Sequence, residues 1–558
     1  MRREMLESFV IGDVLATRAQ ADRAGTFLKF RDGELSYGEV DSMANRVAQG
    51  LISLGVGKGD HVAVMLPNCA DFVFVIFALA RIGAVAVPVN TAHRGETLRH
   101  VLTSSDTTTL VIGEEYADRL APLAPRLPGI GRLLVRTAEG AGKAPQPLAV
   151  PAVKLSGLLA HGDEAPRAGI SFSDLQAIMY TSGTTGPSKG AMVSHALALT
   201  CAYDSLNFLD RWGKTTYCPL PLFHAAGLWD GMLSALLSGG SIAIVDRFSA
   251  SRFWDDVRHF DARVAMSVFS MIPILLNRPP DPRDRDHPLE TFYMGKSALD
   301  EPMRKRFGVR SVETYTSTEV GIATGSRYGE WKPGSCGQAH GERFEVSVVD
   351  ERDREVGAGE PGELVVRPRQ PFVITTGYYG SPEATAECFR NLWFHTGDRV
   401  WRDEDGYFYF LDRMKDAIRR RGENISAFDL ETEVNMHPAV LECAAIGVPS
   451  ELEDEEVKLA VVVRPGARLG PEELAGFCEE QLPRYMVPRY IEFVDSLPRT
   501  PTDKVAKYRL RAEGDHGLTP ATWDREAAGR SPAPAGRQPG ARQPGAGHSP
   551  PEGQKGTV

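Results

Sequence analysis

Serine, threonine, glycine and lysine residues are concentrated between Tyr180 and His195, where the sequence reads YTSGTTGPSKGAMVSH. An apolar run at residues 177–179 directly precedes this stretch and predicts a buried strand. The glycines let backbone approach a ligand closely, the hydroxyls can donate hydrogen bonds, and Lys189 adds a positive charge. Converging donors of this kind bind polyphosphates. A solvated Ser/Gly loop is the alternative, but a linker would not follow a buried strand and lead into a second apolar segment.

The stretch YTSGTTGPSKG cannot be aligned with a Walker A loop, whose pattern is Gly-x-x-x-x-Gly-Lys-Ser/Thr. It resembles the phosphate loop of the adenylate-forming superfamily, which includes acyl-CoA synthetases, adenylation domains and beetle luciferases. The resemblance covers residues 8–527, with the motifs in the family's order. It implies ATP and Mg²⁺ at the site, and CoA as the co-substrate in members that use it.

The same resemblance implies an α/β fold with two domains and a mobile joint. A large multi-layer N-terminal domain with parallel sheets would span residues 1–411. A small α+β C-terminal domain, residues 412–513, would rotate about a hinge at Lys415, and residues 514–558 would form a tail that is disordered from about 530 because it is rich in Pro and Gly.

Residue roles follow from the resemblance, motif by motif. The implied phosphate contacts are Thr181, Ser182, Gly183, Thr184, Thr185, Gly186 and Lys189. In Phe223-His224, an aromatic–His motif, His224 would lie near the substrate carboxylate. In the stretch from Tyr315 to Glu319, Tyr315 would stack on adenine, Thr318 would touch phosphate, and Glu319 would hold Mg²⁺ together with Thr181. A carboxylate beside a hydroxyl suits such an oxygen-seeking ion.

Further motifs complete the implied nucleotide and acceptor sites. Ser297 and Ala298 would lie on a turn that faces the adenine, and Asp398 would accept hydrogen bonds from the ribose hydroxyls. Phe410 and Arg413 are the remaining implied nucleotide contacts. Lys504, in PRTPTDK, matches the family's catalytic lysine. The loop Arg421, Gly422 and Glu423 matches the segment that lines the pantetheine tunnel in CoA-using members, although a charge run is usually only a solvated face.

Four positions depart from the family's pattern: Lys296, where a small residue is usual, and Thr316, Asp412 and Asp503, where glycine is usual. Lys296 either points to solvent or reaches the acyl pocket, where it would favour a polar or anionic acid. The pocket candidates are His224, Trp229, Lys296, Thr316, Val320 and Ile322, and they suggest a small or aromatic acid.

Bulk properties limit the class of protein. A chain of 558 residues is too long for one compact domain. A net charge of −10 argues against nucleic acid as a partner. Seven cysteines without a CxxC pattern indicate reduced thiols and no zinc site. The N-terminus lacks a signal-peptide pattern, so the cytoplasm is the expected compartment.

The elements that must position these motifs alternate between strand and helix patterns. A helix is predicted over 36–54, with a capping box from Ser36 to Glu39. Strands are expected at 61–66, 84–89 and 109–112, a helix at 71–82, and a surface excursion over 120–165. The apolar stretch 72–89 is interrupted by Arg81, Gly83 and Pro88, so a buried helix and strand explain it better than a membrane span. This alternation predicts a parallel, layered fold.

The leading functional hypothesis is an AMP-forming acid–thiol ligase that resembles ligases of the carnitine-CoA or 4-coumarate-CoA kind. A second hypothesis keeps adenylation but changes the acceptor to a carrier-protein thiol, an amine, or nitrite in the diazotisation of an aryl amine. A third is a nucleotide-binding scaffold that has lost turnover. The sequence leaves open which acid is used and whether the chain forms a homodimer.

Overall fold

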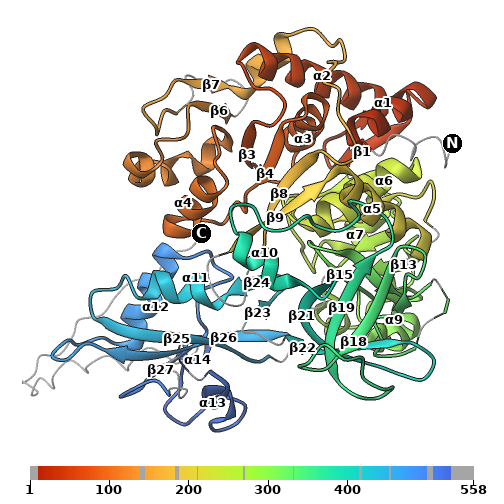
Figure 1. Ribbon diagram of the computed structural model, residues 1–558. Coiled ribbons are helices and arrows are strands. Elements are labelled where there is room, and N and C mark those ends of the chain that lie inside the picture. The colour runs from red at the N-terminus through yellow and green to blue at the C-terminus, as the bar shows by residue number, and fades with distance from the viewer. Residues whose placement is uncertain are drawn as a thin grey trace, which may run out of the picture.

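The computed structural model describes residues 10–137, 145–181, 188–209, 211–267, 271–327, 329–330, 332–413, 417–450, 454–498, 505 and 507–528. A large N-terminal domain is followed by a smaller C-terminal domain, drawn in blue at the lower left of Figure 1. Several predicted site residues lie outside the described residues: Ser182, Gly183, Thr184, Thr185, Gly186, Lys415, Asp503 and Lys504. The side chains of Asp412 and Arg413 also lie outside this description.

The first sheet of the large domain holds the apolar strand that precedes the phosphate loop. In spatial order its strands are β7 (Ala152–Lys154), β6 (Arg132–Arg136), β5 (Thr109–Gly113), β3 (His61–Met65), β4 (Val85–Pro88), β8 (Leu175–Thr181) and β9 (Lys189–Ser194). All neighbouring pairs are parallel except β8–β9. The strands predicted at 61–66, 84–89 and 109–112 are confirmed.

The stretch 120–165 is not only the predicted surface excursion, because its described residues 132–136 and 152–154 form β6 and β7 of the sheet. The sequence signal is weak, since only three apolar residues lie between Arg132 and Arg136. Both arginines anchor the strand: Arg132 Nε donates to the Leu54 carbonyl oxygen at 2.7 Å, and Arg136 pairs with Asp71 at 2.8 Å. The prediction missed β6 because these anchors lie far away in the sequence.

A second sheet of the large domain is also seven-stranded and largely parallel. Its strands are β14 (Arg310–Val312), β13 (Thr291–Tyr293), β12 (Val264–Met266), β10 (Thr216–Cys218), β11 (Ile242–Ile244), β1 (Thr26–Phe30) and β2 (Gly33–Ser36). Only the terminal β1–β2 pair is antiparallel. The parallel, layered fold predicted from the alternating patterns is therefore confirmed.

Helices packed between the two sheets share one core with strands of both. They are α1 (Ile11–Ala21), α2 (Tyr37–Ser53), α3 (Ala70–Ile82), α5 (His195–Leu209), the π-helix η5 (Ala226–Leu233) and α6 (Ser234–Ser238). The capping box of α2 is present: Ser36 Oγ accepts from the Glu39 amide, and Glu39 accepts from the Ser36 amide. Within the described residues no helix combines the length and apolarity that crossing a bilayer requires, and α3 is buried in the core instead.

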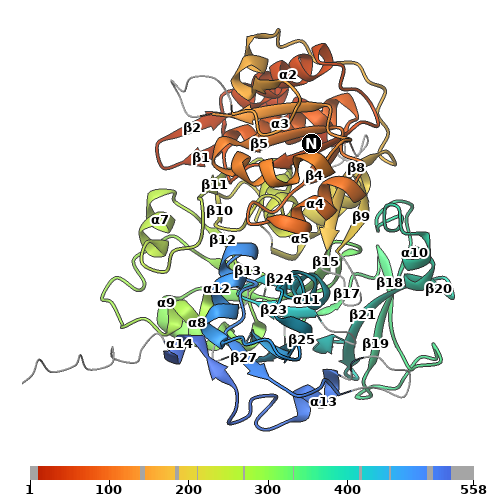
Figure 2. The same ribbon diagram turned by 90° about the vertical axis from the view of Figure 1, so that its left-hand side faces the viewer.

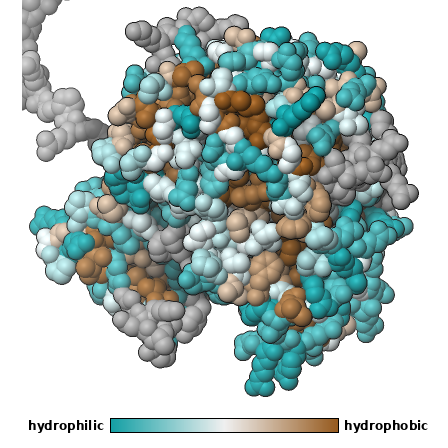
Figure 3. Space-filling view, turned by 45° about the horizontal axis from the view of Figure 1, so that its top comes forward, coloured by the Kyte–Doolittle hydropathy of each residue, from teal (hydrophilic) through white to brown (hydrophobic). Residues whose placement is uncertain are grey.

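Shorter elements complete the large domain. Its remaining helices are η2 (Glu114–Arg119), η3 (Ala121–Arg126), η4 (Leu155–Ala160), α4 (Gly95–Ser104), α7 (Phe253–His259), α8 (Met271–Leu276), η6 (Ser297–Leu299), α9 (Asp300–Phe307) and α10 (Pro382–Cys388). One small sheet contains β15 (Thr314–Ser317), β16 (Gly321–Gly325) and β17 (Gln338–Ala339), and an antiparallel sheet contains β18 (Phe344–Val349), β19 (Gly362–Pro368), β20 (Phe389–Arg390), β21 (Trp393–Arg402) and β22 (Phe408–Arg413). Figure 3 shows apolar residues gathered in patches among hydrophilic ones on the face in view.

The small domain begins with a hairpin and a helix, then builds a four-stranded sheet (Figure 2). Its elements are β23 (Ala417–Arg420), β24 (Glu423–Ser426), α11 (Ala427–Val434), β25 (Val440–Pro449), β26 (Glu455–Val463), α12 (Pro471–Gln481), β27 (Tyr490–Phe493), α13 (Lys507–Ala512), β28 (Trp523–Asp524) and α14 (Arg525–Ala528). β28 lies within the stretch predicted as a tail and pairs with β27, so the sheet of this domain extends beyond residue 513.

Candidate active site

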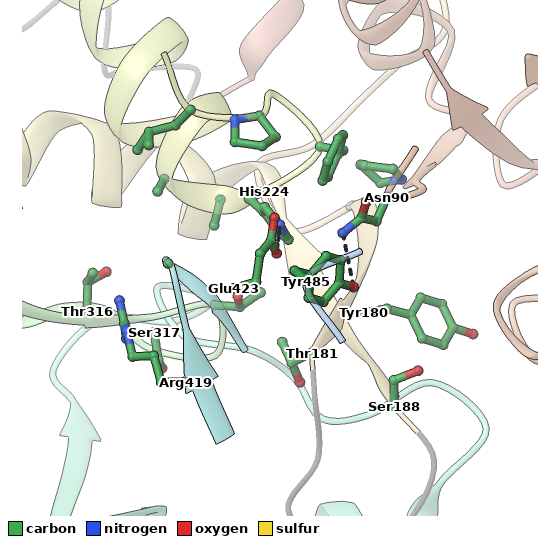
Figure 4. A pocket seen from close by; sticks show the side chains of 18 of the residues that line it. Asn90, Tyr180, Thr181, Ser188, His224, Thr316, Ser317, Arg419, Glu423 and Tyr485 are labelled. Carbon is green, nitrogen blue, oxygen red and sulfur yellow. Dashed lines mark hydrogen bonds and ion pairs between the residues drawn. The ribbon is translucent and has the colours of Figure 1, made fainter. Parts of the chain in front are cut away.

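A cavity of about 830 Å³ lies at the contact between the two domains. Residues at the carboxyl ends of parallel strands line it: Asn90 after β4, Thr181 at the end of β8 and Pro219 after β10. Ligands of open α/β sheets bind at this end of the strands. The small domain contributes the loop from Arg421 to Glu423. It also contributes Arg419 and Tyr485, which Figure 4 shows together with Glu423.

The phosphate side of the cavity is organised around Glu319. Thr181 Oγ1 donates to Glu319 Oε1 at 3.1 Å, and the Tyr378 hydroxyl donates to the same oxygen at 3.0 Å. Lys189 Nζ lies 5.4 Å from the centre of the Tyr378 ring. Thr318 also lines the cavity. The structure thus brings together Thr181, Lys189, Thr318 and Glu319, and it adds Tyr378, which sequence reasoning missed.

The residues around Glu319 fit a magnesium ion that shares its coordination with a nucleotide. Among the described residues no group of three or more His, Cys, Asp or Glu side chains could hold a metal. Mg²⁺ commonly takes only one or two carboxylates and completes its shell with waters and substrate phosphates. Glu319, with the Thr181 hydroxyl beside it, matches that kind of site.

The residues predicted to bind the nucleoside divide into two sets. Asp398 lines the cavity, is 3% exposed, and accepts a hydrogen bond from the Tyr315 hydroxyl at 2.6 Å. Tyr315 is itself buried in the core of the antiparallel sheet. Ser297 is buried and donates to Glu313 and the Ser335 carbonyl oxygen, whereas Ala298 and Phe410 are exposed. Tyr315, Ser297, Ala298 and Phe410 are not among the described residues that line the cavity, and their nucleotide contacts stay predictions.

The acyl side contains two of the six predicted pocket residues. His224 and Thr316 line the cavity together with apolar residues such as Phe248 and Met271. The other four, Trp229, Lys296, Val320 and Ile322, are not among its described lining residues, and three of them are core residues less than 2% exposed: Trp229, Val320 and Ile322. The proposal that Lys296 reaches the acyl pocket has no support in this geometry.

Asp230 is an acidic residue of the cavity wall that sequence reasoning missed. It lies on η5, six residues after His224, and is 1% exposed. Oδ1 has two long contacts, from the Tyr293 hydroxyl at 3.5 Å and Cys201 Sγ at 3.6 Å. Burial raises the pKa of Asp230 to about 7, while the nearby Arg211 guanidinium acts in the opposite direction. The sequence feature that could have indicated Asp230 is an acidic residue inside the otherwise apolar stretch GLWDGML.

The acceptor loop predicted at 421–423 is the turn of the β23–β24 hairpin. Arg421 and Gly422 have φ of +53° and +84°, and two consecutive positive φ values are typical of a two-residue type I′ turn. Glycine takes such a conformation without the steric cost of a side chain. The preceding Arg420 is not on a solvated face. It is 1% exposed, pairs with Glu456, and donates to the carbonyl oxygens of Tyr485 and Val487.

This turn places Glu423 beside His224 of the large domain. His224 Nε2 and Glu423 Oε2 are 2.9 Å apart, and Figure 4 shows the two side chains facing one another. Burial would lower the pKa of His224, but the charge and hydrogen bond of Glu423 raise it overall. Conversely, burial opposes the ionisation of Glu423, but His224 and the nearby His93 bring its pKa below the ordinary value. The predicted acceptor loop therefore reaches the side chain predicted to face the substrate carboxylate.

Two further contacts join the domains. The Asn90 side-chain amide donates to the Tyr485 hydroxyl at 3.4 Å (Figure 4). Glu433, on α11, accepts hydrogen bonds from the amides of Glu96 and Thr97 at the start of α4, at 2.8 and 3.3 Å. Together with the His224–Glu423 pair, they define one orientation of the small domain, in which its hairpin turn lies in the cavity.

Comparison with known proteins identifies the family. A family profile described as AMP-binding enzyme matches residues 15–379, and one described as AMP-binding enzyme C-terminal domain matches residues 429–504. A crotonobetaine/carnitine–CoA ligase of Salmonella paratyphi B is 32% identical over 499 residues, covering 86% of this chain and 93% of that protein.

Solved structures agree with this assignment. The anthranilate CoA ligase AuaEII, in complex with anthranoyl-AMP, has a TM-score of 0.68 and 25% identity, covering 90% of this chain and 96% of that one. The o-succinylbenzoate CoA synthetase of Bacillus subtilis shares the fold, with a TM-score of 0.76 at 24% identity, covering 90% and 99% of the two chains. The chain therefore belongs to the adenylate-forming AMP-binding enzymes and is an ATP-dependent, AMP-forming ligase.

Proposed function

We propose that this enzyme activates a carboxylic acid with ATP and transfers the acyl group to CoA. In the first step a carboxylate oxygen attacks the α-phosphorus of ATP, the bond to pyrophosphate breaks, and an acyl-adenylate forms. In the second step the CoA sulfur attacks the acyl carbon, its proton is lost, and AMP leaves as the thioester forms. The first step therefore replaces the poor leaving group of the free acid with AMP, and the second step uses AMP as the leaving group.

The residues around Glu319 serve the first step. Lys189 and the hydroxyls and amides of residues 181–186 would bind the pyrophosphate that leaves, because oxyanions need several converging donors. Thr181 and Tyr378 hold the Glu319 carboxylate in place through their hydrogen bonds. When bound there, Mg²⁺ would stabilise negative charge on the phosphate oxygens. Lys504 would add a positive charge near the α-phosphate, and Asp398 would accept hydrogen bonds from the ribose hydroxyls.

The position of the hairpin turn of the small domain supports CoA as the acceptor. Arg421, Gly422 and Glu423 line the same cavity as His224 and Glu319, so an acceptor guided by this turn would arrive at the acyl group. We infer that the orientation described above serves the second step, and that rotation about Lys415 would bring Lys504 to the site for the first.

The function is tested by measuring AMP formation from ATP and a panel of acids with four acceptors: CoA, a holo-carrier protein, an amine, and nitrite with an aryl amine. AMP and a thioester are expected with CoA only. Turnover with another acceptor and none with CoA would replace the proposal. Failure of every acid to drive pyrophosphate exchange into ATP would overturn adenylation itself.

We infer that the acid carries a positively charged group at its far end. Crotonobetaine and carnitine, named for the relatives above, are such acids. In this chain the cavity lining includes apolar residues such as Phe248 and Met271, the cation Arg247, and Asp230, whose Oδ1 has long contacts. A cation beside Asp230 would favour the ionised carboxylate and lower its raised pKa.

Asp230→Asn should remove this preference. Wild type should use 4-(trimethylammonio)butanoate better than its neutral isostere 5,5-dimethylhexanoate, and the variant should lose roughly tenfold or more in kcat/KM for the cation only. The measurement is pyrophosphate exchange with both acids. As a control, Asp204→Asn changes another buried acid, paired with His340 and Arg343, that is not among the described lining residues. An equal loss for both acids in Asp230→Asn would indicate a structural role.

A further inference from the structure

Glu433 makes an unusual contact, because it caps a helix that belongs to the other domain. The first amides of a helix have no partner within the helix, and a Ser, Thr, Asp or Asn at the N-cap usually accepts from the second or third of them. The N-cap of α4 is Arg94, whose side chain makes no such bond. Instead the Glu433 carboxylate accepts from the second and third amides, those of Glu96 and Thr97.

The surroundings of Glu433 allow this close approach. Gly95, the first residue of α4, has φ of +47°, and a Cβ atom there would lie 3.2 Å from Glu433 Oε1. The neighbouring Glu96 side chain would repel Glu433, but it pairs with Arg99 at 2.8 Å and with Arg126. Glu433 is 5% exposed, so its carboxylate is largely removed from water where it accepts the hydrogen bonds from α4.

Glu433 is rigidly connected to the turn that enters the cavity. It lies on α11, which directly follows β24, the strand that begins with Glu423. Ile425, Leu430 and Val434 bury this strand and helix in the small-domain core. Figures 1 and 2 both show α4 above α11, so docking of this helix end fixes the position of the hairpin as well. Two of the contacts to the large domain, Glu423–His224 and Glu433–α4, therefore form and break together.

We propose that Glu433 is a positioning residue that holds the small domain in the orientation for thioester formation by capping α4 across the domain boundary. This inference rests on the proposed function, which requires a second orientation for adenylation. In that orientation the Glu96 and Thr97 amides and the Glu433 carboxylate return to water, so the cap stabilises one half-reaction only. Hydrogen-bond acceptance is the essential property, because burial raises the pKa of Glu433 and opposes its charge.

The test separates the two half-reactions in Glu433→Ala and Glu433→Gln. Thioester formation from supplied acyl-adenylate and CoA should fall roughly fivefold to tenfold in the Ala variant, the effect expected for loss of an N-cap. Pyrophosphate exchange should stay within about twofold of wild type. Gln, which keeps the acceptor and the shape, should restore thioester formation to within about twofold. Glu480→Ala, an exposed acid on α12 of the same domain, is the matched control and should change neither rate.

Amide hydrogen exchange supplies a readout that does not depend on turnover. The Glu96 and Thr97 amides should exchange faster in Glu433→Ala than in wild type, and Gln should restore their protection. Equal losses in both half-reactions, a Gln variant no better than Ala, or unchanged amide exchange would overturn the inference. If no acid supports pyrophosphate exchange in wild type, the proposed function fails, while the amide measurement still decides whether Glu433 caps α4.

Discussion

Lys504→Ala is expected to lose adenylation by roughly a hundredfold or more while it still converts a supplied acyl-adenylate and CoA into thioester. The reason is electrostatic, because negative charge gathers on the α-phosphate oxygens only in the first step, and the lysine would offset it there. In the described orientation the Arg421–Glu423 turn lies in the cavity, so the second step would proceed without Lys504. Pyrophosphate exchange measures the first step, and single-turnover thioester formation measures the second.

The control for this experiment is Lys507→Ala, because Lys507 is a nearby lysine that pairs with Glu431 inside the small domain. It should leave the ratio of the two half-reactions unchanged. A Lys504→Ala enzyme that adenylates at the wild-type rate would show that the motif match at residues 498–504 misassigned the lysine.

Glu319→Gln should reduce pyrophosphate exchange by about 10²- to 10³-fold, because the amide keeps the shape of the carboxylate but cannot ligate Mg²⁺ with a full charge. Thr181 and Tyr378 both donate to Glu319 Oε1, and a neutral amide oxygen can still accept from them. The fold around the site should therefore persist. Thermal unfolding of the variant within a few degrees of wild type would check this.

Tyr378→Phe is the matched control for Glu319→Gln, since it removes one hydrogen bond to the Glu319 carboxylate and leaves the charge of that carboxylate in place. A loss of roughly tenfold to a hundredfold is expected, since one hydrogen bond to a charged group contributes about 1.5–3 kcal/mol. The Mg²⁺ dependence of the rate should shift to higher concentration in Glu319→Gln and much less in Tyr378→Phe. Identical Mg²⁺ dependence in wild type and Glu319→Gln would exclude Glu319 as the ligand.

Local motifs were enough to predict several strands of the sheets and several residues that line the cavity. The capping box at Ser36 and the strands at 61–66 and 109–112 follow from residues close together in the sequence. Glu319 and Asp398 were found because each is embedded in a recognisable short pattern. The strand at residues 132–136 was missed because its three apolar residues depend on distant partners for their position.

The residues that sequence reasoning missed share one property, which is a partner far away in the chain. Tyr378 reaches Glu319 across 59 positions, and Glu433 reaches Glu96 across 337. Asp230 lies in an apolar helix, and only the packing of η5 against the cavity makes its carboxylate part of the wall. Trp229 was a natural pocket candidate from the same stretch, but the helix turns it into the core. Which of two adjacent residues faces the cavity depends on the orientation of the helix, and that orientation is set by packing against distant parts of the chain.

The pairing of β28 with β27 has a practical consequence for work on the small domain by itself. β28 covers the outer hydrogen-bonding groups of β27, Trp523 packs against the core, and Arg489 joins Asp524 at 3.1 Å. A fragment that stopped at residue 513 would leave β27 as an open edge strand, which is a template for pairing between molecules. Fragments that run to residue 528 keep that edge protected and should resist self-association.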